Sequence, residues 1–137
     1  MVNFTIKGAP AAKERPRFTS INGKVRAYTP KKSASYKNLV KLEAQKHITK
    51  PIDGPVGLYI HFYLPRPKRL IWKTKQMPAI YTDKRPDIDN LAKSVIDGLN
   101  NIAFRDDGQI AMLHIQKRYC EGNSQSRTSI KIERLKE

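Results

Sequence analysis

The acidic residues of this chain are crowded into one short window. Five of its twelve Asp and Glu residues lie between positions 85 and 110, and all five are Asp. Carboxylates that are held close together repel each other and raise each other's pKa, so a bound cation is expected to offset the repulsion. Carboxylate oxygens suit Mg²⁺ or Mn²⁺, which bind oxygen ligands and keep several waters. The window therefore predicts a divalent-metal site.

The window begins with Asp87 and Asp89, which are two residues apart and directly follow Pro86. If this segment is extended, both carboxylates point to the same side of the chain. A helix is expected to begin near Asp89, and Lys93 lies one helical turn later. Such a lysine is placed to steady the charge that develops at a scissile phosphate, or to orient an attacking water. A simpler role for Asp89 is that of a helix N-cap, which does not exclude metal binding.

The window ends with Asp106 and Asp107, which follow the predicted helix. A suitable arrangement of sheet and helix would place them close to Asp87 and Asp89. Considered alone, Asp107 and the glycine after it are typical of a turn.

Asp97 lies four residues after Lys93, so an ion pair on a solvated helix face is its simplest interpretation. An EF-hand calcium loop is excluded. Counted from Asp87, the position that requires Gly holds Ala92, and the position that requires Glu holds Gly98.

The remainder of the chain is strongly basic, with 27 Lys and Arg residues and a formal net charge of +15. This balance predicts binding to a polyanion, with nucleic acid as the first candidate. A membrane surface is discounted because no long basic helix has a bulky apolar face. The cations expected to contact DNA lie near the start of the chain and in a long loop: Lys13, Arg15, Arg17, Arg66, Lys68, Arg69, Lys73, Lys75, Lys84 and Arg85.

The chain has one cysteine, Cys120, so it cannot form an intrachain disulfide. A reduced, cytoplasmic setting is expected, because the first residues also lack the apolar run of a signal peptide. Cys120 itself is interpreted as a small apolar residue near the end of a strand. The three histidines, His47, His61 and His114, show no ligand spacing.

The pattern of apolar residues predicts one α+β domain over residues 1–137, built from a mixed β-sheet and two main helices. Asn22 and Gly23 indicate a hairpin turn. Trp72 and Tyr81 lie in a basic, Pro-rich loop, where they are candidates either for stacking on an unpaired base or for packing. Strands are expected at 2–6, 17–19, 25–28, 56–64, 109–119 and 127–135, helices from Ser33 or Ser35 to about 47 and from 89 to 101, and a loop at 65–85.

The run RPDIDNLAKSVIDGLNNIAFRDDGQI resembles the signature of the RusA-type Holliday junction resolvases, which are small Mg²⁺-dependent endonucleases. The shared pattern is D-x-D-N-L-x-K, then D-x-L, then D-D-x-Q-[IV]. The segments around 8–17 and 28–30 look like the family's opening in a looser way. Residues 102–105 depart from the family, which often has a more hydrophobic stretch there that contains Trp.

The resemblance implies a role for each matching residue. Asp87, Asp89 and Asp107 would be metal-binding catalytic carboxylates, and Asp106 would be a supporting or additional ligand. Lys93 would be the catalytic lysine, and the role of Asp97 stays open. The implied cofactor is Mg²⁺, with Mn²⁺ as a substitute and no small-molecule cofactor. The implied partners are branched DNA and a second copy of the chain in a homodimer.

Two classes of function follow from the sequence. The first is a metal-dependent, structure-selective endonuclease that resolves four-way junctions by paired symmetric nicks in DNA recombination and repair. Within this class, a nuclease that cuts flaps or forks is the nearest rival. The second class is a basic nucleic-acid-binding module without catalysis, in which the Asp residues are only caps and turns.

Overall fold

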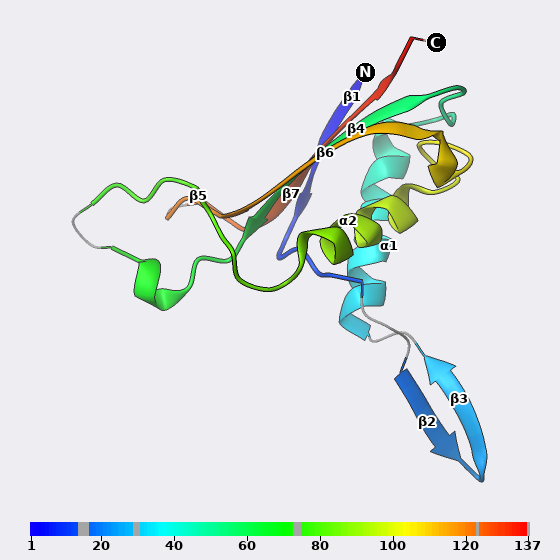
Figure 1. The fold of residues 1–137 in the computed structure, drawn as a ribbon, viewed down its shortest axis with the longest axis horizontal. Coiled ribbons are helices and arrows are strands. Elements are labelled where there is room, and N and C mark those ends of the chain that lie inside the picture. The colour runs from blue at the N-terminus through cyan, green and yellow to red at the C-terminus, as the bar shows by residue number, and fades with distance from the viewer. Residues whose placement is uncertain (14–16, 29–30, 73–74, 123, 137) are drawn as a thin grey trace.

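The structure of the protein is a computed structural model that describes residues 1–13, 17–28, 31–72, 75–122 and 124–136. Its centre is a five-stranded sheet in the order β1-β7-β4-β6-β5 (Figure 1). β4 pairs parallel with β6, and the other neighbours pair antiparallel, so the sheet is mixed as predicted. The strands are β1 (Val2–Lys7), β4 (Val56–Leu64), β5 (Ile80–Tyr81), β6 (Ile110–Tyr119) and β7 (Arg127–Arg134).

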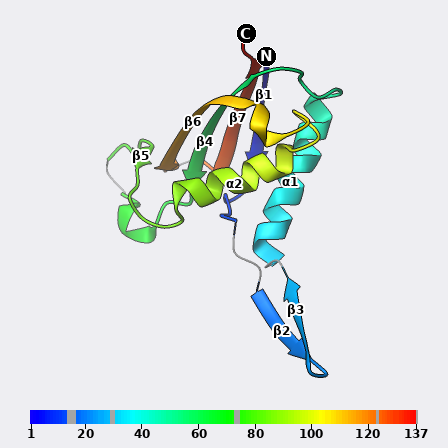
Figure 2. The same cartoon turned by 45° about the vertical axis from the view of Figure 1, so that its right-hand side comes forward.

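Two helices, α1 (Lys31–His47) and α2 (Ile88–Leu99), lie against the same face of this sheet (Figure 2). They approach each other closely at Gly98, where an added Cβ would lie 2.8 Å from the side chain of Val40 and 2.9 Å from the carbonyl oxygen of Lys37. Both helices contribute to one core with the sheet. Among the described residues, no helix is both long enough and apolar enough to cross a membrane.

The central strand β4 explains why the helices cover only one side. Its alternate residues Leu58, Ile60 and Phe62 are fully buried, whereas Tyr59, His61 and Tyr63 between them are only half-buried. Strand side chains alternate between the two faces of a sheet. One face therefore carries the apolar core, and the opposite face carries polar and aromatic side chains. Neither of the helices of the described residues covers that opposite face (Figure 2).

The predicted hairpin is confirmed. β2 (Arg17–Ile21) and β3 (Lys24–Tyr28) pair antiparallel around Asn22 and Gly23. Both turn residues have positive φ, 52° and 77°. The tightest hairpin turns require this geometry, and the Asn-Gly pair tolerates it. The hairpin extends away from the sheet beyond the start of α1 (Figure 1).

Three details differ from the sequence expectation. α1 begins at Lys31, so Ser33 and Ser35 lie inside the helix instead of capping it. α2 begins at Ile88 with Asp87 in the N-cap position, so Asp89 lies in the first turn. The loop at 65–85 contains a short 3₁₀ helix, Lys68–Leu70, and the two-residue strand β5. Cys120 is buried just past β6, as expected.

Candidate active site

The start of α2 holds two accessible carboxylates. Asp87 occupies the N-cap position with extended backbone, but its side chain makes no capping hydrogen bond. Its side chain is 54% exposed, and Nη1 of Arg85 lies 3.9 Å from its Oδ2. Asp89 lies in the first turn and is exposed. Both are stabilised by the free N–H groups and the positive end of the helix dipole, and their oxygens stay open to a ligand.

One face of α2 connects this pair to the second acidic pair. Asp89, Lys93 and Ile96 lie within roughly 60° of one another around the helix axis, since each residue turns the helix by about 100°. Ile96 and Asp107 line the same hollow, of about 310 Å³. Ile96 lies about two helical turns after Asp89, so Asp107 shares this hollow with the C-terminal half of α2. Lys93, which is exposed, lies between Asp89 and Ile96 on this face.

The second acidic pair is positioned by Gln109, a role that was not predicted from the sequence. Its side-chain oxygen accepts from the backbone N–H of Arg105 at 2.8 Å and of Asp106 at 3.2 Å. Its side-chain nitrogen donates to the carbonyls of Ile52 at 2.8 Å and Gly54 at 2.9 Å. The only sequence signal for this role was the Gln of the D-D-x-Q pattern.

The two carboxylates of this turn have different surroundings. Asp106 accepts a hydrogen bond from the backbone N–H of Gly108 at 3.0 Å, so its carboxylate caps the short 3₁₀ helix Asp107–Gln109. Asp107 lies in that helix and is exposed. Of the two, Asp107 has the freer oxygens for a metal ion or a phosphate-bound water.

The four carboxylates do not meet at one point within a single chain. Among the described residues, no group of three or more His, Cys, Asp or Glu side chains is arranged to hold a metal ion. Asp87 and Asp89 lie at the start of α2, and Asp106 and Asp107 lie in the turn that precedes β6. The ligand chemistry nevertheless fits a hard cation, because Asp87, Asp89 and Asp107 are exposed oxygen donors, and Mg²⁺ usually binds one or two carboxylates together with waters and substrate phosphates.

Asp97 does not pair with Lys93, and that expectation was wrong. Its Oδ2 lies 2.8 Å from Nζ of Lys13 instead. The backbone N–H of Lys13 also donates to the carbonyl of Asn90 at 2.9 Å. The first segment of the chain runs beside α2 and reaches Asp97 from outside the helix. Lys93 is thereby left accessible for another partner.

The basic loop is held together by its own cations. Arg66 donates to the carbonyls of Leu70 at 2.5 Å, Pro78 at 2.8 Å and Cys120 at 3.3 Å. The Trp72 ring has Arg66 4.8 Å and Lys75 5.7 Å from its centroid. Arg66 and Trp72 therefore have structural roles in the loop, and their contact with DNA stays a prediction.

Lys117 of β6 positions the end of the loop. Its Nζ donates to the carbonyls of Lys84 at 2.6 Å and Pro86 at 2.9 Å, one residue before Asp87. Lys68, Arg69, Lys75, Lys84 and Arg85 are exposed, as DNA contacts require. Arg15 and Lys73 lie outside the described residues, as does the side chain of Arg17.

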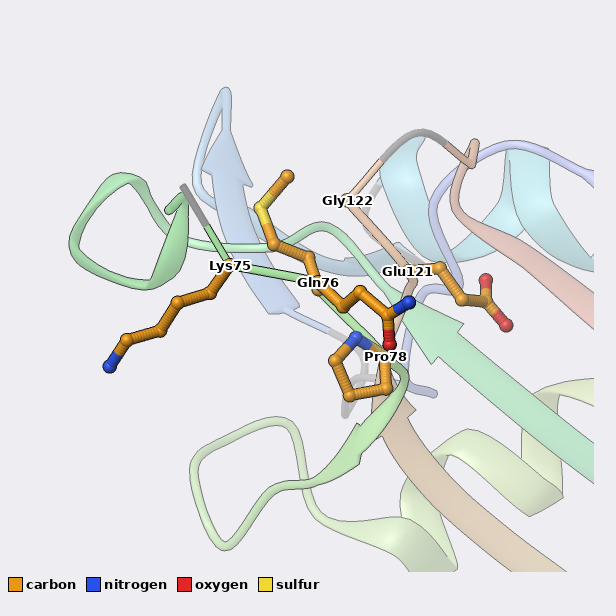
Figure 3. Close-up of a pocket in the computed structure, with 6 residues that line it drawn as sticks. Lys75, Gln76, Pro78, Glu121 and Gly122 are labelled. Atoms are coloured by element: carbon orange, nitrogen blue, oxygen red, sulfur yellow. The ribbon is translucent and has the colours of Figure 1, made fainter. Parts of the chain in front are cut away.

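A hollow of about 340 Å³ lies between the basic loop and the residues that follow β6 (Figure 3). Met77 fills the space beside Gly122, and the backbone N–H of Gly122 donates to the carbonyl of Met77 at 2.9 Å. None of the four predicted acidic ligands lines it. The hollow is therefore part of the loop's attachment and not the candidate active site.

A sequence model of the family described as "Endodeoxyribonuclease RusA" matches residues 7–133. The chain belongs to the RusA family. It is also 36% identical over 126 residues to the uncharacterized protein YqaN of Bacillus subtilis (strain 168), which covers 88% of this chain and 89% of that protein. The RusA match includes the whole acidic window, α2 and Lys93, so the resemblance found in the motif extends over nearly the full chain.

Proposed function

We propose that this RusA-family protein is a divalent-metal-dependent endodeoxyribonuclease that resolves four-way DNA junctions. The observation that supports the proposal is one face of α2, on which Asp89, Lys93 and Ile96 follow one another. Ile96 lines the same hollow as Asp107. Helix caps and turns do not require a lysine between two acidic groups. The basic surface supplies the attraction for a DNA backbone.

The proposed roles follow from the surroundings of each side chain. Asp87, Asp89 and Asp107 would hold Mg²⁺, and Asp106 would keep the turn in place and support Asp107. When bound, Mg²⁺ supplies a Lewis acid for the scissile phosphate and lowers the pKa of a coordinated water. Lys93 would stabilise the negative charge that develops on the phosphate. The exposed cations of the loop would bind phosphates on either side of the cut.

We propose that the protein acts as a homodimer and that β6 provides the interface. β5 pairs only with the end of β6, at Arg118 and Tyr119. One further hydrogen bond runs from the backbone N–H of Thr82 to the carbonyl of Lys117. In the part of the chain that the structure describes, residues 110–116 have no main-chain partner on this side.

This open edge lacks the devices that protect edge strands. It has no Lys, Arg, Asp or Glu between positions 110 and 116, and Met112 and Leu113 are 40% and 45% exposed. An uncharged, apolar edge strand pairs readily with another strand. A second β6 across a two-fold axis would cover the hollow beside Asp107 and present two active sites to a junction of near two-fold symmetry.

The test is a panel of labelled DNA substrates of equal length: a four-way junction, a 5′ flap, a replication fork and a linear duplex. Each is incubated with the protein in Mg²⁺ or in EDTA. The proposal predicts paired, symmetric nicks in the four-way junction that require Mg²⁺. Preferential cutting of the flap or fork would favour the rival nuclease. Binding without cutting in Mg²⁺ or Mn²⁺ would leave only the non-catalytic module.

A further inference from the structure

We propose that the sheet face turned away from the helices is a second DNA-binding surface. This surface holds the phosphate backbone of a DNA strand that runs from the active site around the β5 edge of the sheet. The inference deepens the proposed function and rests on it for the identity of the polyanion as DNA. None of the residues that carry it lies in the acidic window or among the cations predicted from the sequence.

The centre of this surface is a row of side chains that crosses the whole sheet. Pairing places Lys7 opposite Arg127, Arg127 opposite Tyr63, Tyr63 opposite Arg118, and Arg118 opposite Tyr81. Residues directly opposite on paired strands point to the same face. With strands about 4.8 Å apart, the row is roughly 19 Å long, the rise of about five to six nucleotides of a B-form strand.

Aromatic rings hold the cations of this face in place. The guanidinium of Arg127 lies 3.9 Å from the ring centroid of Tyr63, and that of Arg118 lies 4.4 Å from the ring of Tyr81. Arg118 also donates from Nη2 to the hydroxyl of Tyr81 at 2.6 Å. A stacked guanidinium has lost side-chain freedom before a ligand arrives and can still donate from its edge to phosphate oxygens.

Two rows further along the same face, beyond the row of Ser129, His61 and Gln116, the arrangement recurs. Lys131 lies opposite Tyr59, and Tyr59 lies opposite His114. The ammonium of Lys131 is 4.8 Å from the centroid of the Tyr59 ring. The hydroxyl of Tyr59 donates to the carboxylate of Glu133 at 2.9 Å, so this acidic side chain already has a hydrogen-bond partner on the face.

The charges of the surface favour a polyanion over a second copy of the chain. Arg127 is paired with Glu121, at 3.1 Å and 3.3 Å. Lys7, Arg118 and Lys131 have no recorded ion pair among the described residues. Two such faces brought together would place like charges opposite each other, which is unfavourable. A phosphate backbone is attracted to the same cations.

The row begins where the chain enters the active site. Lys117 and Arg118 are adjacent on β6 and point to opposite faces of the sheet. Lys117 holds the carbonyls of Lys84 and Pro86 on the side of Asp87, and Arg118 holds Tyr81 on the bare face. Tyr81 is 68% exposed at the edge between them. A DNA strand that passes Asp87 can therefore continue over Tyr81 onto the row.

The experiment compares two triple variants that remove the same charge. The first is Lys7→Gln, Arg118→Gln, Lys131→Gln on the bare face, and the control is Lys37→Gln, Lys41→Gln, Lys50→Gln on and after α1. Affinity for a labelled four-way junction, single strand and duplex is measured by fluorescence anisotropy over a range of NaCl concentrations in EDTA. Circular dichroism and thermal melts confirm that both variants fold, and Arg118→Lys tests whether charge alone suffices.

The proposal predicts at least about tenfold weaker junction binding for the bare-face variant than for the control, and a salt slope smaller by about three. The single-strand and duplex probes show which form of backbone the surface holds. Equal losses in both variants would overturn the proposal, because they would reflect net charge alone. Unchanged affinity with a loss of dimer in light scattering would also overturn it. Failure of the wild type to cut junctions would refute the proposed function and leave this binding comparison interpretable.

Discussion

Asp97 and Lys13 form an ion pair with 2.8 Å between Oδ2 and Nζ, and it attaches the first segment of the chain to the helix that carries Asp89 and Lys93. The adjacent backbone bond from Lys13 to Asn90 strengthens the attachment. The segment leads toward the basic hairpin β2–β3. The ion pair thus fixes the position of the first segment of the chain relative to α2.

Replacing Lys93 by Ala should reduce junction cleavage by about a hundredfold or more, because a preorganised cation at the developing phosphate charge contributes about 10²–10³ to the rate. Junction affinity should change only slightly, since Lys93 is one cation among many. Cleavage is measured with the protein in excess over the junction. Lys41→Ala, which removes an exposed lysine of α1, should leave the rate unchanged. A comparable loss in both variants would contradict the proposed role of Lys93.

Replacing Gln109 by Ala should destabilise the protein by about 2–3 kcal/mol, because it removes bonds that connect the acidic turn to Ile52 and Gly54 and leaves their carbonyls without these donors. Cleavage should also fall, since Asp107 loses its support. Urea unfolding and cleavage are measured on the same preparation. Gln45→Ala, on the exposed side of α1, is the control. A variant that keeps wild-type stability would show that Gln109 does not hold the turn.

Replacing Leu113 by Glu should convert the proposed dimer to monomer, because a charge on the open edge of β6 opposes strand pairing. Light scattering after size exclusion measures the mass. Leu42→Glu places the same charge on an exposed leucine of α1 and should leave the dimer intact. If the wild type is monomeric at all concentrations tested, or if Leu113→Glu stays dimeric, the interface is wrong.

The pKa of His61 is held below its usual range, first by burial and then by the nearby charges of His114 and Arg118. Between this lowered pKa and the ordinary value of about 6.5, the folded protein binds fewer protons than the unfolded chain. The contribution of His61 to the free energy of unfolding is therefore fully present above about pH 6.5 and is lost as the pH falls toward the lowered pKa. His61→Gln should lose less melting temperature between pH 7.5 and pH 5 than the wild type. Identical losses would contradict the assignment.

Local patterns were sufficient for much of this fold. The alternation of Tyr59 and His61 with Leu58 and Ile60 identified β4, and the Asn-Gly pair identified the hairpin. The spacing of Leu91, Val95 and Leu99 identified the buried face of α2. Each of these signals is contained in a few consecutive residues, and tertiary packing agrees with it.

Other features depend on distant parts of the chain and leave no local signal. β5 has only two residues and exists because β6 pairs with it. The partner of Asp97 is 84 positions away, so the helical neighbour Lys93 was the only candidate that spacing offered. The bonds of Gln109 to Ile52 and Gly54 likewise join separate segments. For the candidate site, the sequence proposed four acidic residues and Lys93, and their roles stay predictions. That Gln109 holds the turn of Asp106 and Asp107 to Ile52 and Gly54 could not be predicted from local spacing.

The most direct test of the central claim is the single change Asp89→Asn, compared with Asp83→Asn in the adjacent loop. Cleavage and affinity for one labelled four-way junction are measured for both variants and the wild type. We expect Asp89→Asn to abolish Mg²⁺-dependent nicking and to keep or improve junction binding, because a charge that repels the phosphate is removed. Asp83→Asn should cut normally. Normal cutting by Asp89→Asn would contradict the proposed role of the carboxylates.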